Sequence, residues 1–274
     1  MKYYTRIEKY KDRSKPVDAN LCYENESPKK NHWGIFTILL LIGIAIVGAC
    51  IFFALPKEDA NSVPVARKEI SQSIVQANPE LIPEFNGSDF VELNNNQPGF
   101  STDDYELIGG EYYSSLDYLG RCGVVYANID ASMRPTEERG SIGMIKPSGW
   151  NQAKYEGYVD SKPPYLFNRC HLIAYALTGQ NANEQNLITG TRYFNVTSML
   201  PFEEQVMHYL DKSSNHVLYR VTPFFKGTEL VARGVEMEAY SIEDNGAGVC
   251  FHVFVYNYQP GIEIDYKTGD SWIK

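Results

Sequence analysis

An uncharged apolar segment from Gly34 to Leu55 constrains this chain more than any other feature. It contains 22 residues, and Thr37 is the most polar of them. As a helix rising 1.5 Å per residue it would span about 33 Å, close to the hydrocarbon thickness of a bilayer. Cleaved signal peptides have shorter apolar cores and short basic leaders, whereas 33 residues precede this segment. We therefore expect a single transmembrane signal-anchor over residues 34–55.

The charges that flank this segment predict its orientation. Lys29 and Lys30 precede it, whereas the other side begins with Lys57, Glu58 and Asp59 and has no positive excess. By the positive-inside rule, residues 1–33 form a cytoplasmic leader and the rest lies outside. Low aromatic content predicts a stalk over residues 56–80, followed by a folded domain over residues 81–274.

One alternative exists for the attachment to the membrane. The sequence VGAC, which ends at Cys50, resembles a bacterial lipobox, in which the cysteine is lipidated and becomes the mature N-terminus. The long leader and the apolar residues after Cys50 argue against this reading. In both cases the product is tethered outside the cytoplasmic membrane.

The exported cysteines do not form a recognisable framework. Cys122, Cys170 and Cys250 are odd in number, and the chain has no C-x-x-C motif. Neither a zinc site nor a disulfide scaffold is therefore indicated, and buried apolar thiols are the default expectation. A single Cys122–Cys170 bridge remains an alternative.

The charge distribution limits the kind of nucleic-acid contact that this chain can make. Its net charge is −9, whereas a protein that coats nucleic acid is normally basic. The stretch from Arg121 to Arg192 nevertheless holds eight basic and six acidic residues. A local positive field of this kind can steer an anionic substrate to one cleft.

Alternating apolar and polar residues predict an antiparallel sheet. Strands are expected over residues 122–130, 216–225, 229–242 and 248–258, with a hairpin at EDNGAG between the last two. Residues 201–213 predict a helix with Pro201 in its first turn. The loop over 134–150, rich in Pro and Gly, is longer than a connector needs to be. We predict an α+β domain with a sheet core.

Polar side chains gather downstream of the long loop. On an extended strand Arg169 and His171 point to the same face. Asn186 and Asn195 follow, and a helical path returns Glu203 to the side of Asn195. An imidazole, a guanidinium, carboxamides and a carboxylate are the groups needed to hydrolyse a phosphodiester with a hard divalent ion.

The motifs that hold these residues resemble those of a known family. NRCHLIAYALTG, NEQNLITGTRYFNV, LGRCGVVYANI and YNYQPGIEIDYKTGDS are similar to the DNA/RNA non-specific endonucleases of the ββα-metal (His-Me finger) superfamily, in particular the extracellular or membrane-anchored enzymes of Gram-positive bacteria. The resemblance covers nearly the whole exported domain. It implies an antiparallel sheet with a ββα-metal finger, and cleavage of DNA, or of RNA as well, with little sequence preference and 5′-phosphate products.

The resemblance also implies roles for individual residues. The D-R-G-H motif of the family falls on residues 168–171, which makes His171 the general base and Arg169 a phosphate contact. Asn186 matches an asparagine that supports the site by orienting the base or a metal-bound water. Arg139, in the long loop, is a candidate for a transition-state contact.

The implied cofactor is Mg²⁺, with Mn²⁺ as an alternative. Asn195 matches the asparagine that ligates the metal, and Glu203 matches a helix carboxylate that holds metal-bound waters. The chain departs from the motif at Asn168, in place of Asp, and at Cys170, in place of Gly. We expect activity to survive both departures and Cys170 to pack inward.

Two other readings stay open from the sequence. The domain could be a catalytically inactive relative that binds nucleic acid or a surface partner, although the presence of His171, Arg169, Asn186 and Asn195 argues against it. It could also be an unrelated exported structural module rich in β-strands, which leaves the density of motifs unexplained.

Overall fold

The structure is a computed structural model that describes residues 82–106 and 110–274. The expected leader, the apolar segment 34–55 and the stalk 56–80 lie outside these ranges, so they stay predictions. Within the described ranges, no helix is both long enough and apolar enough to cross a bilayer. All described residues belong to one compact unit, Ala66–Lys274.

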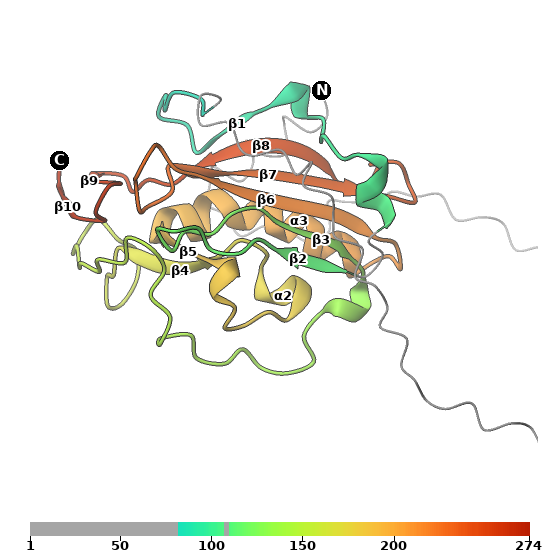
Figure 1. The fold of residues 1–274 in the computed structure, drawn as a ribbon, viewed down its shortest axis with the longest axis horizontal. Helices are drawn as coiled ribbons and strands as arrows, with labels where there is room; N and C mark the ends of the chain where they lie inside the picture. The colour runs from blue at the N-terminus through green and yellow to red at the C-terminus, as the bar shows by residue number, and fades with distance from the viewer. Residues whose placement is uncertain (1–81, 107–109) are drawn as a thin grey trace, which may run out of the picture. The chain divides into compact units, whose positions relative to one another are not determined.

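A six-stranded antiparallel sheet forms the centre of the domain (Figure 1). Its strands run in the order β1-β8-β7-β6-β3-β2. Their bounds are β1 Phe90–Glu92, β2 Glu111–Tyr113, β3 Val125–Ile129, β6 Val217–Phe224, β7 Gly234–Ser241 and β8 Cys250–Tyr256. β3, β6, β7 and β8 confirm the predicted strands and the hairpin between the last two. The strand predicted over 229–242 begins later, at Gly234, because the N–H groups of Leu230 and Val231 donate to the carbonyl of Tyr266 outside the sheet.

A ββα unit follows the long loop. β4 (Phe167–His171) pairs antiparallel with β5 (Leu187–Thr191), and a helical stretch comes next. This stretch begins as a π-helix, η6 (Phe194–Met199), and continues as the α-helix α3 (Leu200–Leu210). Pro201 lies in the first turn of α3, as predicted.

The remaining elements are short. A two-stranded sheet near the C-terminus joins β9 (Ile262–Ile264) to β10 (Ser271–Ile273). The α-helix α2 and the 3₁₀ helices are α2 Tyr175–Thr178, η2 Asn94–Asn96, η3 Thr102–Glu106, η4 Ala131–Met133 and η5 Glu184–Asn186. The predicted α+β class is confirmed, as is the long loop, which has neither helix nor strand over residues 134–150.

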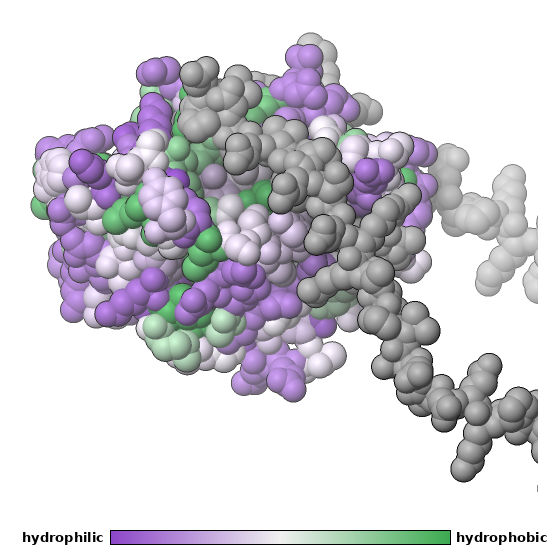
Figure 2. All heavy atoms as spheres, in the orientation of Figure 1, coloured by the Kyte–Doolittle hydropathy of each residue, from purple (hydrophilic) through white to green (hydrophobic). Residues whose placement is uncertain are grey.

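The two faces of the central sheet carry different residues. Tyr219, Ala239 and Phe251 are neighbours across β6, β7 and β8 and are buried beneath α3, where the ring of Phe202 lies 5.1 Å from that of Phe251. The neighbouring row of residues points to the opposite face and is polar. It consists of Arg220 on β6, Glu238 on β7 and His252 on β8. Figure 2 shows one side of the molecule, on which hydrophilic residues predominate and hydrophobic ones form small patches. The catalytic candidates on the ββα unit therefore pack on one face of the sheet only.

The three described cysteines are free thiols. Cys122 and Cys170 are therefore not joined, and the alternative of a Cys122–Cys170 bridge is wrong; both side chains are buried. The Cys122 thiol instead bonds to the carbonyl of Leu187 at 3.2 Å. The default expectation of buried thiols holds for these two.

Candidate active site

His171 is the last residue of β4, and its ring has a defined tautomer. Nε2 lies 2.9 Å from the carbonyl oxygen of Asn181. Because a carbonyl only accepts, Nε2 carries the proton, and Nδ1 keeps a lone pair that can accept a hydrogen bond or a proton. The ring is 7% exposed, so its orientation is fixed by packing as well as by this bond. Nδ1 is thus the basic nitrogen of the site.

Arg139 reaches this basic nitrogen from the long loop. Its Nη2 donates to Nδ1 of His171 at 3.2 Å. Burial lowers the pKa of His171, the bond to Asn181 opposes this effect, and the charge of Arg139 lowers the pKa further. The imidazole is therefore neutral at neutral pH, which is the form that a general base requires.

Arg169 shares a cleft with Arg139, but much of its guanidinium is engaged within the protein. Its Nε donates to the carbonyl of Ile145 and its Nη2 to that of Gly143 at 2.8 Å. Its guanidinium carbon lies 4.1 Å from the ring centroid of Trp150. Arg169 therefore fixes the end of the long loop, and its other donors remain for a ligand in the cleft.

Asn186 supports the site through the backbone. Its Oδ1 accepts from the N–H of Ile173, and its Nδ2 donates to the carbonyl of the same residue, both at 2.9 Å. The side chain is fully buried, and both bonds go to the backbone of one residue, two positions beyond His171. Asn186 therefore fixes the backbone just after β4, the strand that ends at His171. Neither of its side-chain bonds goes to the ring of His171.

Asn195 and Glu203 lie on the helical stretch, and the residues around them suit a divalent cation. Asn195 sits in the π-helix and lines the cleft with Arg139 and Arg169. Burial and the charge of Glu204 raise the pKa of Glu203 to about 8, although Arg139 lowers it. The positive charge around Glu203 is therefore too small to keep its carboxyl group ionised at neutral pH, and a hydrated cation held by carboxamide and carboxylate oxygens would add to that charge.

An orphaned hydroxyl, that of Tyr219, lies close to this carboxylate. The hydroxyls of Ser198 and Tyr219 are buried and have no hydrogen-bond partner among the described residues. The charge of Glu203 contributes to the raised pKa of Tyr219, after burial, so the two groups are near each other. Polar atoms without partners are the surroundings that waters around an ion would satisfy. The residues present therefore fit the metal that the resemblance implies.

Cys170 packs inward, as predicted. Its side chain is fully buried between the two strands, on the side away from Arg169 and His171. A Cβ on Gly190 would lie 2.4 Å from its sulfur and 2.7 Å from the ring of Phe194. The larger residue in place of the motif glycine is thus accommodated by a glycine on the facing strand.

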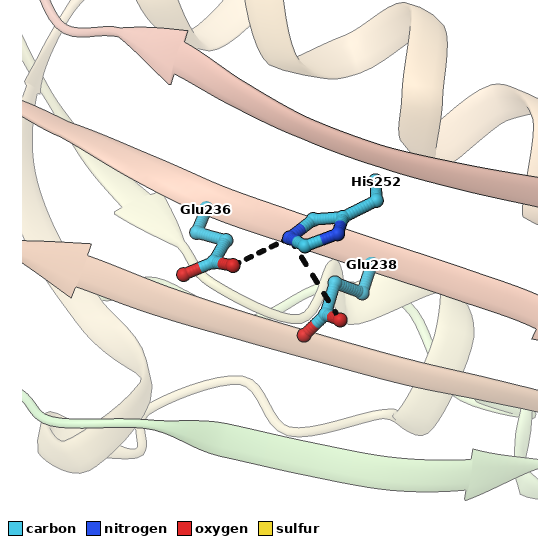
Figure 3. A group of neighbouring side chains, drawn as sticks. All are labelled: Glu236, Glu238 and His252. Carbon is cyan, nitrogen blue, oxygen red and sulfur yellow. Dashed lines mark hydrogen bonds and ion pairs between the residues drawn. The ribbon is translucent and has the colours of Figure 1, made fainter. Parts of the chain in front are cut away.

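A second polar group lies on the opposite face of the sheet (Figure 3). Glu236 and Glu238 of β7 point at the ring of His252 on β8, and one ligand atom of each lies within 4.8 Å of the other two. That spacing could accommodate one cation. Glu238 is already bonded to Arg220 at 2.7 Å, and Nε2 of His252 lies 2.5 Å from Glu236. Charge at this group is thus balanced within the protein by Arg220 and His252.

The cleft also holds residues that the sequence did not single out. It has a volume of about 390 Å³, and its lining includes Trp150, Tyr165 and Arg192 besides the predicted Arg139, Arg169 and Asn195. Of the described site residues, the buried His171, Asn186 and Glu203 are not among those that line it. Arg192 was counted only as part of a basic stretch. The backbone N–H of Arg192 donates to the carbonyl of Leu166 at 2.7 Å, so β4 and β5 bring Arg192 and Tyr165 to the same end of the finger. If the register of the β4–β5 pairing had been predicted from the sequence, it would have placed Arg192 next to Tyr165.

The domain is thus an antiparallel sheet that carries a ββα unit, whose neutral histidine is bonded to an arginine of the long loop. Residues 101–243 match the family model for the DNA/RNA non-specific endonuclease. The chain belongs to this DNA/RNA non-specific endonuclease family.

Known proteins that resemble the chain are nucleases. It is 34% identical over 111 residues to a deoxyribonuclease of Streptococcus dysgalactiae subsp. equisimilis, a match that covers 38% of this chain and 32% of that protein. The chain thus spans about a third of the length of that relative. The crystal structure of NucA from Streptococcus agalactiae with a magnesium ion bound shares 28% identity at a TM-score of 0.59, over 68% of this chain and 87% of that one. The Sda1 nuclease with a bound zinc ion shares 27% identity at a TM-score of 0.52, over 61% and 83%.

Proposed function

We propose that this protein is a membrane-anchored, outward-facing endonuclease that hydrolyses phosphodiester bonds of DNA, and of RNA as a second substrate, with little sequence preference and with Mg²⁺ as cofactor. The observation that carries the proposal is the state of His171. Its Nε2–H is held by a carbonyl, and its Nδ1 accepts from Arg139, which lines a cleft together with Arg169 and Arg192.

His171 acts as the general base in this proposal. Nδ1 takes a proton from a water molecule as that water attacks the phosphorus, and the bond to Asn181 keeps the ring in the required tautomer. Arg139 occupies Nδ1 when no substrate is present. Its guanidinium leaves the nitrogen when a phosphate offers stronger, charge-assisted hydrogen bonds. Substrate binding would thereby free the base.

Asn195 and Glu203 would hold the cation, Asn195 directly and Glu203 through water. A bound divalent ion supplies stabilisation of the charge that develops on the phosphoryl and leaving oxygens. NucA with a bound magnesium ion and Sda1 with a bound zinc ion support a metal-assisted site in relatives of this fold. The free donors of Arg169 bind the phosphate from the side of the long loop.

The membrane location rests on the sequence. The apolar segment 34–55 and the lysines before it support an anchor with the catalytic domain outside the cell. Membrane fractions should hold the full-length protein, and protease added to intact cells should remove residues beyond the anchor. Protection from that protease would overturn the proposed orientation.

A plasmid-nicking assay tests the activity. The full-length chain in detergent should convert supercoiled plasmid to nicked and linear forms with Mg²⁺, and excess chelator should stop the reaction. His171→Ala should lower the rate at least about 100-fold, which is the scale of general-base catalysis. His208→Ala removes an exposed histidine of α3 and serves as the matched control. Binding of plasmid without nicking would instead support an inactive, nucleic-acid-binding relative.

A further inference from the structure

The cleft beside His171 extends past the groups that the proposed reaction uses. Its lining includes three arginines, and none of the described residues that line it is a carboxylate. The net charge of the whole chain is −9, so this concentration of positive charge is local. A volume of about 390 Å³ lies in the range of small-molecule sites. The cleft is therefore suited to an anion that carries a further, less polar part.

The hydrogen bonds single out Arg192 among the three arginines. Arg139 is bonded to His171, and Arg169 is bonded to two carbonyls of the long loop. The Nε–H of Arg192 is buried and has no acceptor among the described residues. A buried donor without a partner is unfavourable, so a shift of the Arg192 side chain that brings this N–H to a phosphate in the cleft would be favoured. A guanidinium matches the oxygens of a phosphate with two parallel hydrogen bonds.

Asn168 removes a negative charge from the same cleft. It lines the cleft at the position where the motif of the family has an aspartate. An aspartate there would repel an anion, whereas a carboxamide offers both a donor and an acceptor. The departure from the motif therefore favours a phosphate at this place.

Aromatic side chains form the less polar part of the cleft. Tyr165 is 41% exposed, and the ammonium of Lys154 lies 5.0 Å from its ring centroid. The ring of Trp150 is covered by Arg169. A cation therefore lies over each ring, but Tyr165 is the more exposed of the two, which makes it the aromatic platform at the end of the ββα unit where Arg192 lies. Aromatic rings of this kind stack on nucleobases with little regard to sequence.

We propose that this cleft is a subsite for the nucleotide next to the scissile phosphodiester, in which Arg192 and Asn168 bind the phosphate and Tyr165 stacks on the base. The inference rests on the proposed function and extends it to the substrate form. A base on Tyr165 has left the stack of its neighbours, so single-stranded nucleic acid enters the subsite without unpairing. Single-stranded substrates should therefore have lower KM values than duplexes of the same sequence.

The test measures binding separately from cleavage. The full-length chain is titrated against fluorescein-labelled dT12 by anisotropy, in excess chelator and at several KCl concentrations. Arg192→Gln should raise Kd and lower the slope of log K against log salt by about 0.7, the value for one phosphate contact on a single strand. Arg192→Lys should keep the slope. The matched control Lys267→Gln removes an exposed positive charge outside the cleft and should change neither quantity.

Tyr165 gives an independent readout. Tyr165→Ala should weaken binding about fivefold or more without changing the salt slope, whereas Tyr165→Phe should retain affinity. The proposal is overturned if both Arg192→Gln and Tyr165→Ala leave Kd and the slope at wild-type values. The two conservative variants show whether any loss comes from misfolding, because they keep the size of each side chain.

A kinetic arm separates this inference from the proposed function. With Mg²⁺, Arg192→Gln and Tyr165→Ala should raise KM for dT12 more than they lower kcat. A wild-type chain that binds dT12 but does not cleave it would refute the nuclease function and leave the subsite standing. A wild-type chain that cleaves dT12, with KM unchanged in both variants, would refute the subsite alone.

Discussion

The polar group of Glu236, Glu238 and His252 should make the stability of the domain depend on pH. His252 is 9% exposed, its Nε2 lies 2.5 Å from Glu236 and 3.8 Å from Glu238, and its Nδ1 lies 3.0 Å from the carbonyl of Gln97 (Figure 3). Burial lowers the pKa of His252, but the bond to Glu236 and the charge of Glu238 oppose this effect and raise the pKa overall. The protonated imidazole thus joins two carboxylates to the segment before η3.

The expected magnitude follows from the bonds that His252→Phe removes. The charge-assisted bond to Glu236 contributes about 1.5–3 kcal/mol, and the bond to Gln97 about 0.5–1.5 kcal/mol. Glu236 is partly exposed, and Glu238 keeps its bond to Arg220, so we take the lower half of this range. His252→Phe should lower the free energy of unfolding by about 2–3 kcal/mol at pH 5.5.

The sign of the pH dependence is fixed by the direction of the pKa shift. A histidine whose folded-state pKa is raised contributes stability that is fully present below its unfolded pKa of about 6.5. This contribution is lost as the pH rises through the folded-state pKa. The difference between wild type and His252→Phe should therefore shrink at pH 9 to about 1 kcal/mol, the part due to the bond with Gln97.

Urea unfolding of the full-length chain, followed by tryptophan fluorescence at several pH values, measures this difference. His208→Phe changes an exposed histidine and should shift the free energy of unfolding by no more than about 0.5 kcal/mol. A difference for His252→Phe that stays constant from pH 5.5 to pH 9, or grows with pH, would refute the reasoning.

Three further predictions concern the ββα unit formed by β4, β5 and the helical stretch that follows them. His171→Gly should regain part of its nicking activity when imidazole is added, because the missing group is a proton acceptor; no recovery at any imidazole concentration would contradict that role. Asn186→Ala should lower the free energy of unfolding by about 2–4 kcal/mol, since it leaves both backbone groups of Ile173 without partners, and a thermal melt with an unchanged midpoint would exclude this account. Gly190→Ala should destabilise the domain by about 1–3 kcal/mol because the new methyl would overlap the sulfur of Cys170, and Cys170→Ala in the same chain should restore part of that loss.

Much of the fold could be predicted from the sequence because one physical rule governs it. β7 alternates between apolar residues and the carboxylates of Glu236 and Glu238, whereas β6 and β8 are buried almost throughout and are rich in β-branched and aromatic residues. The motif around His171 likewise identified a strand and the residues that point away from the core. The boundaries of the membrane segment stay predictions, because they lie outside the described residues.

The rest of the site depends on contacts between residues far apart in the chain. The bonds of Asn186 go to Ile173, 13 residues earlier, and nothing in local spacing distinguishes a carboxamide that holds backbone from one that orients a base. Arg192 and Tyr165 meet only because β4 and β5 pair in one particular register. Arg139 belongs to a loop without periodicity, so its contact with His171 could be expected only by resemblance.

The π-helical start of the finger helix has a consequence for how activity could be lost. Bonds in η6 run from residue i to residue i+5, so Asn195 is presented by a turn that contains more residues than an α-helical turn. Deletion of one residue after Asn195 would convert this turn to α geometry and rotate Asn195 by about 100° relative to Glu203. An inactive descendant could therefore arise with every catalytic side chain still present. A sequence comparison that checks only the active-site residues would classify such a protein as active. The one-residue deletion in this turn would be the only sign of the loss.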